Sequence, residues 1–136
     1  MAPKLSIPVI DVRDAAQAHV NALYHGQDGN RYLVSKLKGE SFLQMANILK
    51  KEFKDSSYMF PTKEAPKFAV WAMSFFDKRL AHSLPSYGKE FEFNNSKSIK
   101  ELQVDYCDIS LSLTQMAHNL IEIGYIEDLT NKMDLI

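Results

Sequence analysis

The segment from residue 66 to residue 81, PKFAVWAMSFFDKRLA, restricts the possible folds of this chain more than any other. Its apolar residues recur at intervals of three and four, which predicts a helix, and Pro66 suits the first turn of that helix. The helix has two apolar faces, one with Ala69, Ala72, Met73, Phe76 and Leu80 and a second with Phe68, Trp71 and Phe75. Because a helix that is apolar nearly all round has to be covered on both faces, this one belongs in a core or at an interface.

A second helix is predicted to begin at Asp14, whose carboxylate can accept hydrogen bonds from the free N–H groups of a first helical turn. Gly26 stands where this helix should end, because glycine readily adopts the backbone conformations that follow a helix. The apolar face of the helix is expected to hold Ala16, Val20 and Leu23.

Two pairs of serine and glutamine have the spacing of capping boxes. In a capping box at the start of a helix, the side chain of each residue hydrogen-bonds to the backbone N–H of the other. Ser41 with Gln44 opens a predicted helix over residues 41–53, with a stripe of Phe42, Met45, Ala46, Leu49 and Phe53. Ser112 with Gln115 opens another, which Gly124 ends, with a stripe of Leu113, Met116, Ala117, Leu120 and Ile121.

Three short segments have the aromatic and β-branched content of strands, namely residues 9–12, 31–35 and 91–95. After the last of them, Ser96 can cap a brief helix whose Ile99 and Leu102 point inward. The alternation of strands and helices predicts an α/β fold. A sheet of so few short strands, surrounded by apolar helices, lacks its other half.

The composition narrows the classes of function. The 136 residues suit one domain, and 16 basic against 17 acidic residues without a basic stripe argue against nucleic acid as a partner. No apolar run approaches the roughly 20 residues that span a membrane, and the N-terminus lacks the architecture of a signal peptide. Cys107 is the only cysteine and no Cys/His cluster has metal spacing, so we expect no metal site and a reduced, cytoplasmic setting.

Two stretches resemble a known enzyme family. Residues 7–23, IPVIDVRDAAQAHVNAL, and residues 93–126, FNNSKSIKELQVDYCDISLSLTQMAHNLIEIGYI, resemble segments of the extended short-chain dehydrogenases. GNRYLVS, residues 29–35, matches a strand that lies between those segments in the family. The nearest subgroup is that of dihydroflavonol reductase, cinnamoyl-CoA reductase and NADPH-dependent aldehyde (methylglyoxal) reductase.

The resemblance is to the C-terminal, substrate-binding portion of those Rossmann-type enzymes only. It implies that residues 1–126 form this portion, with residues 127–136 as a loose tail. The parent enzymes use NADP(H) to reduce a small carbonyl substrate to an alcohol. Their glycine-rich loop, which receives the cofactor's pyrophosphate at a helix N-terminus, and their catalytic Ser, Tyr and Lys lie in the N-terminal part. We therefore expect no catalytic residue and no cofactor site in this chain, and an inactive protein on its own.

RYLVSK, residues 31–36, places Tyr32 and Lys36 at the interval of the family's catalytic pair. In those enzymes the pair lies on one face of a helix, where the lysine lowers the pKa of the tyrosine that acts as acid and base. On a predicted strand the two residues are roughly 13 Å apart. We interpret them as ordinary strand residues.

The residues that carry the first resemblance have a structural interpretation and a catalytic one. Asp11 and Asp14 could form a carboxylate pair for acid/base chemistry, but a helix cap and a turn, with Arg13 paired to either carboxylate, is the favoured interpretation. His19 has no second ligand at metal spacing and is expected to be packed and hydrogen-bonded.

An apolar wall for the substrate is the remaining candidate site. The variable region before residue 91 helps to form the substrate pocket in the resembling enzymes, and here it is rich in aromatic residues suited to an aryl or aliphatic carbonyl compound. The pocket candidates are Tyr58, Phe60, Phe68, Trp71 and Phe75. The alternative is an interaction module, in which the same aromatic face binds a copy of the chain, giving a homo-oligomer, or an N-terminal partner.

Overall fold

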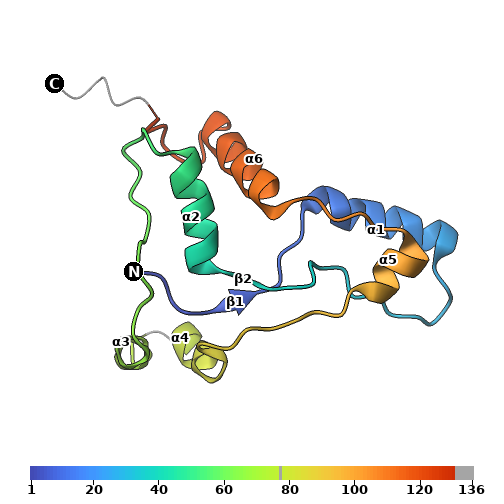
Figure 1. Ribbon diagram of the computed structural model, residues 1–136, viewed down its shortest axis with the longest axis horizontal. Coiled ribbons are helices and arrows are strands. Elements are labelled where there is room, and N and C mark those ends of the chain that lie inside the picture. The colour runs from blue at the N-terminus through green and yellow to red at the C-terminus, as the bar shows by residue number, and fades with distance from the viewer. Residues whose placement is uncertain (77, 131–136) are drawn as a thin grey trace. The chain divides into compact units, whose positions relative to one another are not determined.

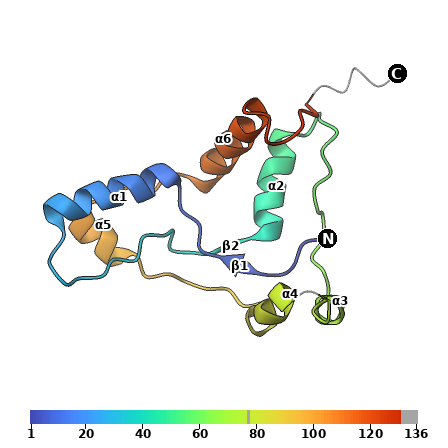
Figure 2. The same ribbon diagram turned by 180° about the vertical axis from the view of Figure 1, so that it is seen from behind.

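The computed structural model describes residues 1–76 and 78–130 and has a small α/β fold (Figures 1 and 2). A two-stranded sheet pairs β1 with β2, and helices make up most of the regular structure. In chain order the elements are β1 (Ser6–Ile7), α1 (Val12–His25), β2 (Glu40–Ser41), α2 (Phe42–Glu52), α3 (Lys67–Met73), α4 (Lys78–Ser83), the 3-10 helix η1 (Leu84–Ser86), α5 (Ser96–Leu102) and α6 (Ile109–Glu122).

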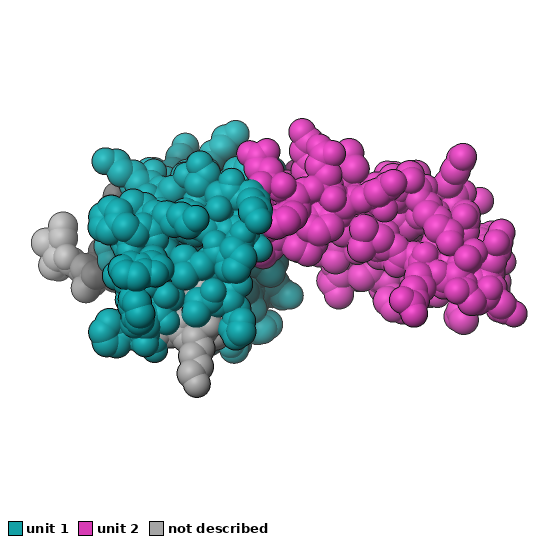
Figure 3. All heavy atoms as spheres, turned by 90° about the horizontal axis from the view of Figure 1, so that it is seen from below, with its two compact units in different colours: residues 1–5, 41–89, 110–136 teal, residues 6–40, 90–109 magenta. Residues whose placement is uncertain are grey.

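The chain forms two compact units, each assembled from segments that are distant in sequence (Figure 3). Unit 1 contains Met1–Leu5, Ser41–Lys89 and the chain from Ser110 onward. Unit 2 contains Ser6–Glu40 and Glu90–Ile109. The sequence did not predict this division, because it depends on which distant segments pack together.

In unit 2, α1 begins three residues before the predicted start, because its N-cap is Asp11 and not Asp14. Asp11 is the N-cap, and its carboxylate accepts from the Arg13 N–H at 2.8 Å, so the predictions of a strand over residues 9–12 and of Asp14 as the cap are wrong. Gly26 ends the helix as predicted, with its N–H bonded to the Ala22 carbonyl. The buried face of α1 also differs from the predicted one. Asp14 and Ala18 are buried, while Leu23, on the predicted apolar face, is 84% exposed.

The core of unit 2 lies between α1 and α5, which pack side by side. Ala18, Leu102 and Val104 form its buried cluster, with Ala22, Tyr32, Val34 and Tyr106 packed around them. Leu102 points inward as predicted, but Ile99 is half exposed and Ser98 is fully buried in its stead. Asn95, not Ser96, is the N-cap of α5.

The segments predicted as strands at residues 31–35 and 91–95 form no regular strand. Antiparallel pairing is confined to a bridge between Lys38 and Glu92, where Gly39 N–H donates to the Phe91 carbonyl at 3.1 Å and Phe93 N–H to that of Leu37 at 2.7 Å. Outside this bridge the backbone has other hydrogen-bond partners. Lys36 N–H donates to the Val9 carbonyl, and the Ser35 carbonyl accepts from the side-chain amide of Asn95. The predicted strands are therefore wrong, and the backbone pairing instead joins residues 37–39 to residues 91–93.

In unit 1, α2 and α6 lie side by side (Figures 1 and 2). The capping box at the start of α2 is confirmed: Gln44 N–H donates to Ser41 Oγ at 3.1 Å, and Ser41 N–H donates to Gln44 Oε1 at 2.8 Å. The second box is wrong, because α6 begins at Ile109 and Ser112 lies inside it. Gly124 ends α6 as predicted, with a φ of 71° that suits glycine.

The predicted helix over residues 66–81 is interrupted. Its first part is α3, which closes at Ser74, where the Ser74 hydroxyl donates to the Trp71 carbonyl at 2.6 Å. This carbonyl is thereby satisfied without a further helical turn. Val70 is the buried residue of α3, but neither predicted apolar face is covered. Phe68, Trp71 and Phe75 of one face are exposed, as are Met73 and Phe76 of the other. The side chain of Leu80, also placed on that face, lies outside the described residues.

The first residues of the predicted tail are tied to the loop after α2. Tyr58 Oη donates to the Glu127 carbonyl at 2.6 Å and accepts from the Leu129 N–H at 3.1 Å. Ser57 N–H donates to the Leu129 carbonyl at 3.0 Å. Residues 131–136 of the predicted tail lie outside the described residues.

Candidate functional site

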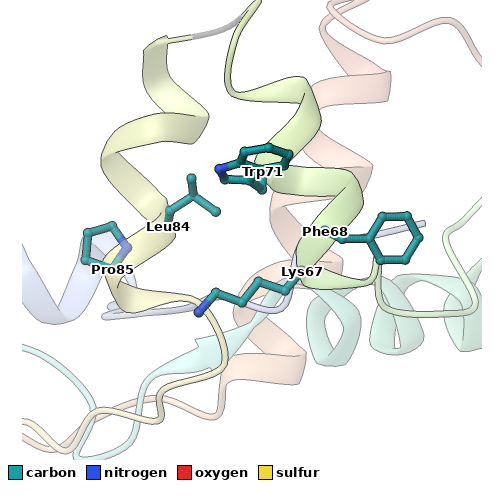
Figure 4. A pocket seen from close by; sticks show the side chains of 5 residues that line it. All are labelled: Lys67, Phe68, Trp71, Leu84 and Pro85. Atoms are coloured by element: carbon teal, nitrogen blue, oxygen red, sulfur yellow. The ribbon is translucent and has the colours of Figure 1, made fainter.

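An open groove on unit 1 contains two of the predicted pocket residues (Figure 4). It has a volume of about 630 Å³, and Phe68 and Trp71 line it together with Lys67, Leu84 and Pro85. Trp71 and Leu84 point toward one another, and the Lys67 side chain extends from α3 toward η1. A third candidate, Phe75, supports Trp71 from outside the groove through an edge-to-face contact with ring centroids 4.9 Å apart.

Local signals place the two walls of this groove. Pro66 is the N-cap of α3 with a φ of −69°, and burial of Val70 leaves Phe68 and Trp71 on the outer side of the helix. Proline also stands in η1, whose backbone it restricts to a tight turn. The Tyr87 hydroxyl, directly after η1, donates to the Ala65 carbonyl directly before α3, which holds the walls together.

The chemistry of the groove is that of an apolar binding surface. Among the side chains that the structure describes, its lining is aromatic and aliphatic apart from the ionisable Lys67. Such a surface suits an aryl or branched alkyl group, and aromatic contacts of this kind are worth roughly 0.5–1.5 kcal/mol beyond the area that they bury.

The other two pocket candidates do not line this groove. The Tyr58 ring packs at 5.5 Å from that of Phe53 and at 6.3 Å from that of Phe60, and its hydroxyl holds the residues after α6. Leu84 and Pro85 line the groove although the sequence analysis did not predict them. The available signal was the Leu-Pro pair itself, since proline favours a turn there.

The DVRD residues form a polar cluster at the start of α1 in unit 2. Buried Asp11 accepts from Arg13 Nε at 2.9 Å and from Arg13 Nη2 at 2.7 Å, and this hydrogen-bonded ion pair raises the pKa of the guanidinium. Buried Asp14 accepts from the Cys107 N–H at 2.9 Å. Asp11 therefore takes the capping role that was predicted for Asp14, while Asp14 binds a backbone N–H from a segment distant in sequence.

Cys107 joins this cluster from the other side of unit 2. The hydrogen bond to the Asp14 carboxylate, and next the loss of hydration on burial, raise the pKa of the Cys107 thiol. Its carbonyl accepts from Lys36 Nζ at 2.9 Å. Because a raised pKa keeps the sulfur protonated, the thiol is a poor nucleophile near neutral pH.

Tyr32 and Lys36 have different partners. Tyr32 Oη donates to Glu101 Oε2 at 2.7 Å, and Lys97 Nζ lies 4.8 Å from the centre of the tyrosine ring. Lys36 is held by the Cys107 carbonyl. Both side chains thus connect the residues 31–36 to the region of α5, and neither is placed to tune the other.

His19 is hydrogen-bonded but not packed. Its Nδ1 lies 2.7 Å from the Ala15 carbonyl one turn earlier in α1, and the residue is exposed. The prediction of a hydrogen bond is confirmed, and that of a packed ring is wrong. No cluster of three or more His, Cys, Asp or Glu side chains with metal-binding geometry is found within residues 1–76 and 78–130.

The glycines do not fit a dinucleotide cofactor. Gly26 and Gly124 follow helices, and Gly29 and Gly88 lie in turns with positive φ. Gly39 lies shortly before α2, but the space where a Cβ would stand is taken by Ser6 Oγ at 2.5 Å and the Phe93 ring at 3.3 Å. The close approach therefore serves packing inside unit 2, and no glycine cradles a pyrophosphate at a helix N-terminus.

Within the described part of the chain, no helix is both long and apolar enough to cross a membrane. Comparison with protein-family models, with curated proteins and with solved structures gives no match for this chain.

Proposed function

We propose that this chain supplies the substrate-binding portion of an NADP(H)-dependent reductase that converts a carbonyl compound to an alcohol, of the extended short-chain dehydrogenase type. The groove between α3 and η1 is the observation that carries the proposal, because Phe68 and Trp71 were expected in a substrate pocket and line an apolar surface of suitable size. The likeness of residues 7–23 and 93–126 to that family gives the reaction class.

In this proposal the groove holds the apolar part of the substrate, and the N-terminal part of such an enzyme brings NADP(H) and the catalytic Ser, Tyr and Lys. The chain alone is then inactive. Two findings support this assignment: Tyr32 and Lys36 are engaged with separate partners, and the glycines do not fit the cofactor. A reduced, cytoplasmic setting belongs to the same proposal, since the only cysteine is a free thiol.

Fluorescence of Trp71 can test the proposal, because it is the only tryptophan in the chain and it lines the groove. We expect benzylacetone, an aryl ketone, to change its emission in a saturable way, and Phe68→Ala to weaken the binding several-fold. Phe76→Ala is the matched control, since Phe76 is 95% exposed and does not line the groove.

A parallel titration with NADPH should give no saturable energy transfer from Trp71 and no binding by calorimetry. Tight NADPH binding by the chain alone would refute the assignment to a substrate-binding portion. Absence of any response to aryl ketones would remove the groove as its substrate site.

A non-catalytic interaction module is the second candidate, favoured by the exposed aromatic residues around α3. Phe68, Phe75 and Phe76 are 74%, 71% and 95% exposed, and Met73 is 59% exposed. Contiguous apolar surface of this kind is typical of interfaces. Sedimentation velocity distinguishes the candidates: a dimer that Phe75→Ala dissociates favours the module, whereas a monomer at all concentrations contradicts self-association.

A further inference from the structure

Three segments of unit 1 meet at the ends of the groove walls. Residues 63–67 lead into α3, residues 84–89 contain η1, and residues 1–5 run along both. Ala2 N–H donates to the Lys63 carbonyl at 3.0 Å, and the Ala2 carbonyl accepts from Ala65 N–H at 2.8 Å. Gly88 N–H donates to the Lys4 carbonyl at 2.8 Å. The backbones of these three segments are therefore joined to one another beside the groove walls.

The charge of these segments is strongly positive. They contain four lysines, Lys4, Lys63, Lys67 and Lys89, and one acidic residue, Glu64. Glu64 Oε2 is paired with Lys4 Nζ at 3.2 Å. Lys67 makes no ion pair with any carboxylate of residues 1–76 and 78–130, and it lines the groove beside Trp71. Among the described residues, Lys67 is thus a cation without a carboxylate partner at an apolar surface, and the three joined segments carry an excess of positive charge.

We propose that this groove selects ligands that join an aryl or branched alkyl group to an anionic group, with Lys67 as the residue that holds the anion. The inference rests on the proposed function, whose substrate class it narrows to carbonyl compounds that carry a carboxylate or phosphate. A neutral ligand fills the apolar wall but leaves the ammonium group in water. An anion of the same shape makes the additional ion pair, and the neighbouring lysines raise its local concentration.

Three ligands of nearly identical shape isolate the charge: hydrocinnamate, hydrocinnamamide and benzylacetone have a carboxylate, an amide and a methyl ketone on the same phenylethyl group. Trp71 emission reports binding of each to the full chain. Because an exposed ion pair is worth about 0.2–1 kcal/mol, we expect hydrocinnamate to bind about 1.4- to fivefold more tightly than hydrocinnamamide at low salt. The preference should disappear at high salt, since the pair is partly open to solvent.

Lys67→Gln should abolish the preference for the carboxylate, and benzylacetone, which has no anionic group, should lose less affinity than hydrocinnamate does. Lys89→Gln is the matched control, because it also removes one positive charge from the three joined segments. Lys89 does not line the groove, so the preference should largely remain. Circular dichroism of both variants confirms that each is folded.

Three results would overturn the inference. Equal binding of hydrocinnamate and hydrocinnamamide, with benzylacetone also bound, refutes the anion selectivity and leaves the proposed function in place. Absence of a Trp71 response to all three ligands refutes both. Phosphatidylglycerol vesicles are tested at the same concentration of lipid as of hydrocinnamate. A blue shift of Trp71 emission with the vesicles, without a response to hydrocinnamate, assigns the surface to a membrane instead.

Discussion

Replacing Leu102 by alanine should make unit 2 unfold more often, and the alkylation rate of Cys107 can measure this unfolding. Leu102 is the largest fully buried side chain of this unit, at 1% exposure, and its cluster neighbours are Ala18 and Val104. Leu→Ala substitutions in cores cost about 2–5 kcal/mol, and the cost rises with the volume of the remaining cavity. Because alanine and valine are too short to fill the space, we expect a loss of about 3 kcal/mol in the free energy of unfolding.

The assay is alkylation of Cys107 under native conditions. The thiol belongs to unit 2, is the only one in the chain, and is held beside Asp14 in the folded state. When opening is a fast pre-equilibrium, a change of about 3 kcal/mol increases the labelling rate on the order of 100-fold. Leu111→Ala is the matched control, because Leu111 is 50% exposed and should change the rate only a few-fold. Equal labelling rates for Leu102→Ala and the unmodified chain would refute the assignment of Leu102 to the core.

Three other predictions concern individual contacts. Because the pKa of the Cys107 thiol is raised in the folded state, folding stability should be constant below the unfolded pKa of about 8.5 and should fall as pH rises through the higher folded pKa. Asp14→Asn should shift the pH profile of Cys107 alkylation to lower pH, and an unshifted profile would contradict the role of the Asp14 carboxylate. Ser41→Ala should cost about 0.5–2 kcal/mol in urea denaturation followed by circular dichroism, whereas Ser112→Ala, at a serine with the same spacing to a glutamine but inside α6, should cost almost nothing. Gly39→Ala should destabilise the chain by about 1–3 kcal/mol in the same assay, because its Cβ would stand 2.5 Å from a side-chain oxygen of β1; a neutral result would show that the backbone shifts freely there.

The helix ends that were predicted correctly depend on residues within one turn. The capping box needs only Ser41 and Gln44, three positions apart, and Gly124 needs only a left-handed backbone to end α6. The same serine–glutamine spacing failed at Ser112, because burial of Ile109 favours an earlier start of α6. A cap works only at a helix end, and packing decides where that end lies.

The buried face of α1 was beyond the reach of sequence patterns. Periodicity favoured Val20 and Leu23 as inward residues, but the structure buries Asp14 and Ala18. Asp14 supplies the acceptor for the Cys107 N–H, which comes from a segment 93 positions away in the chain. A buried carboxylate with such a partner cannot be distinguished locally from a solvent-exposed helix cap.

For the candidate site too, local sequence patterns predicted one part, and contacts between distant segments decided the other. The sequence by itself determined that a helix follows Pro66 and that residues 67–76 are rich in aromatic groups, because periodicity and composition are local properties. Only the tertiary structure decided that Phe68 and Trp71 meet Leu84 and Pro85 in a groove and that Tyr58 turns to the residues after α6. That choice depends on hydrogen bonds between distant segments, such as Tyr87 to Ala65 and Gly88 to Lys4, whose energies have no counterpart in the pattern of neighbouring residues.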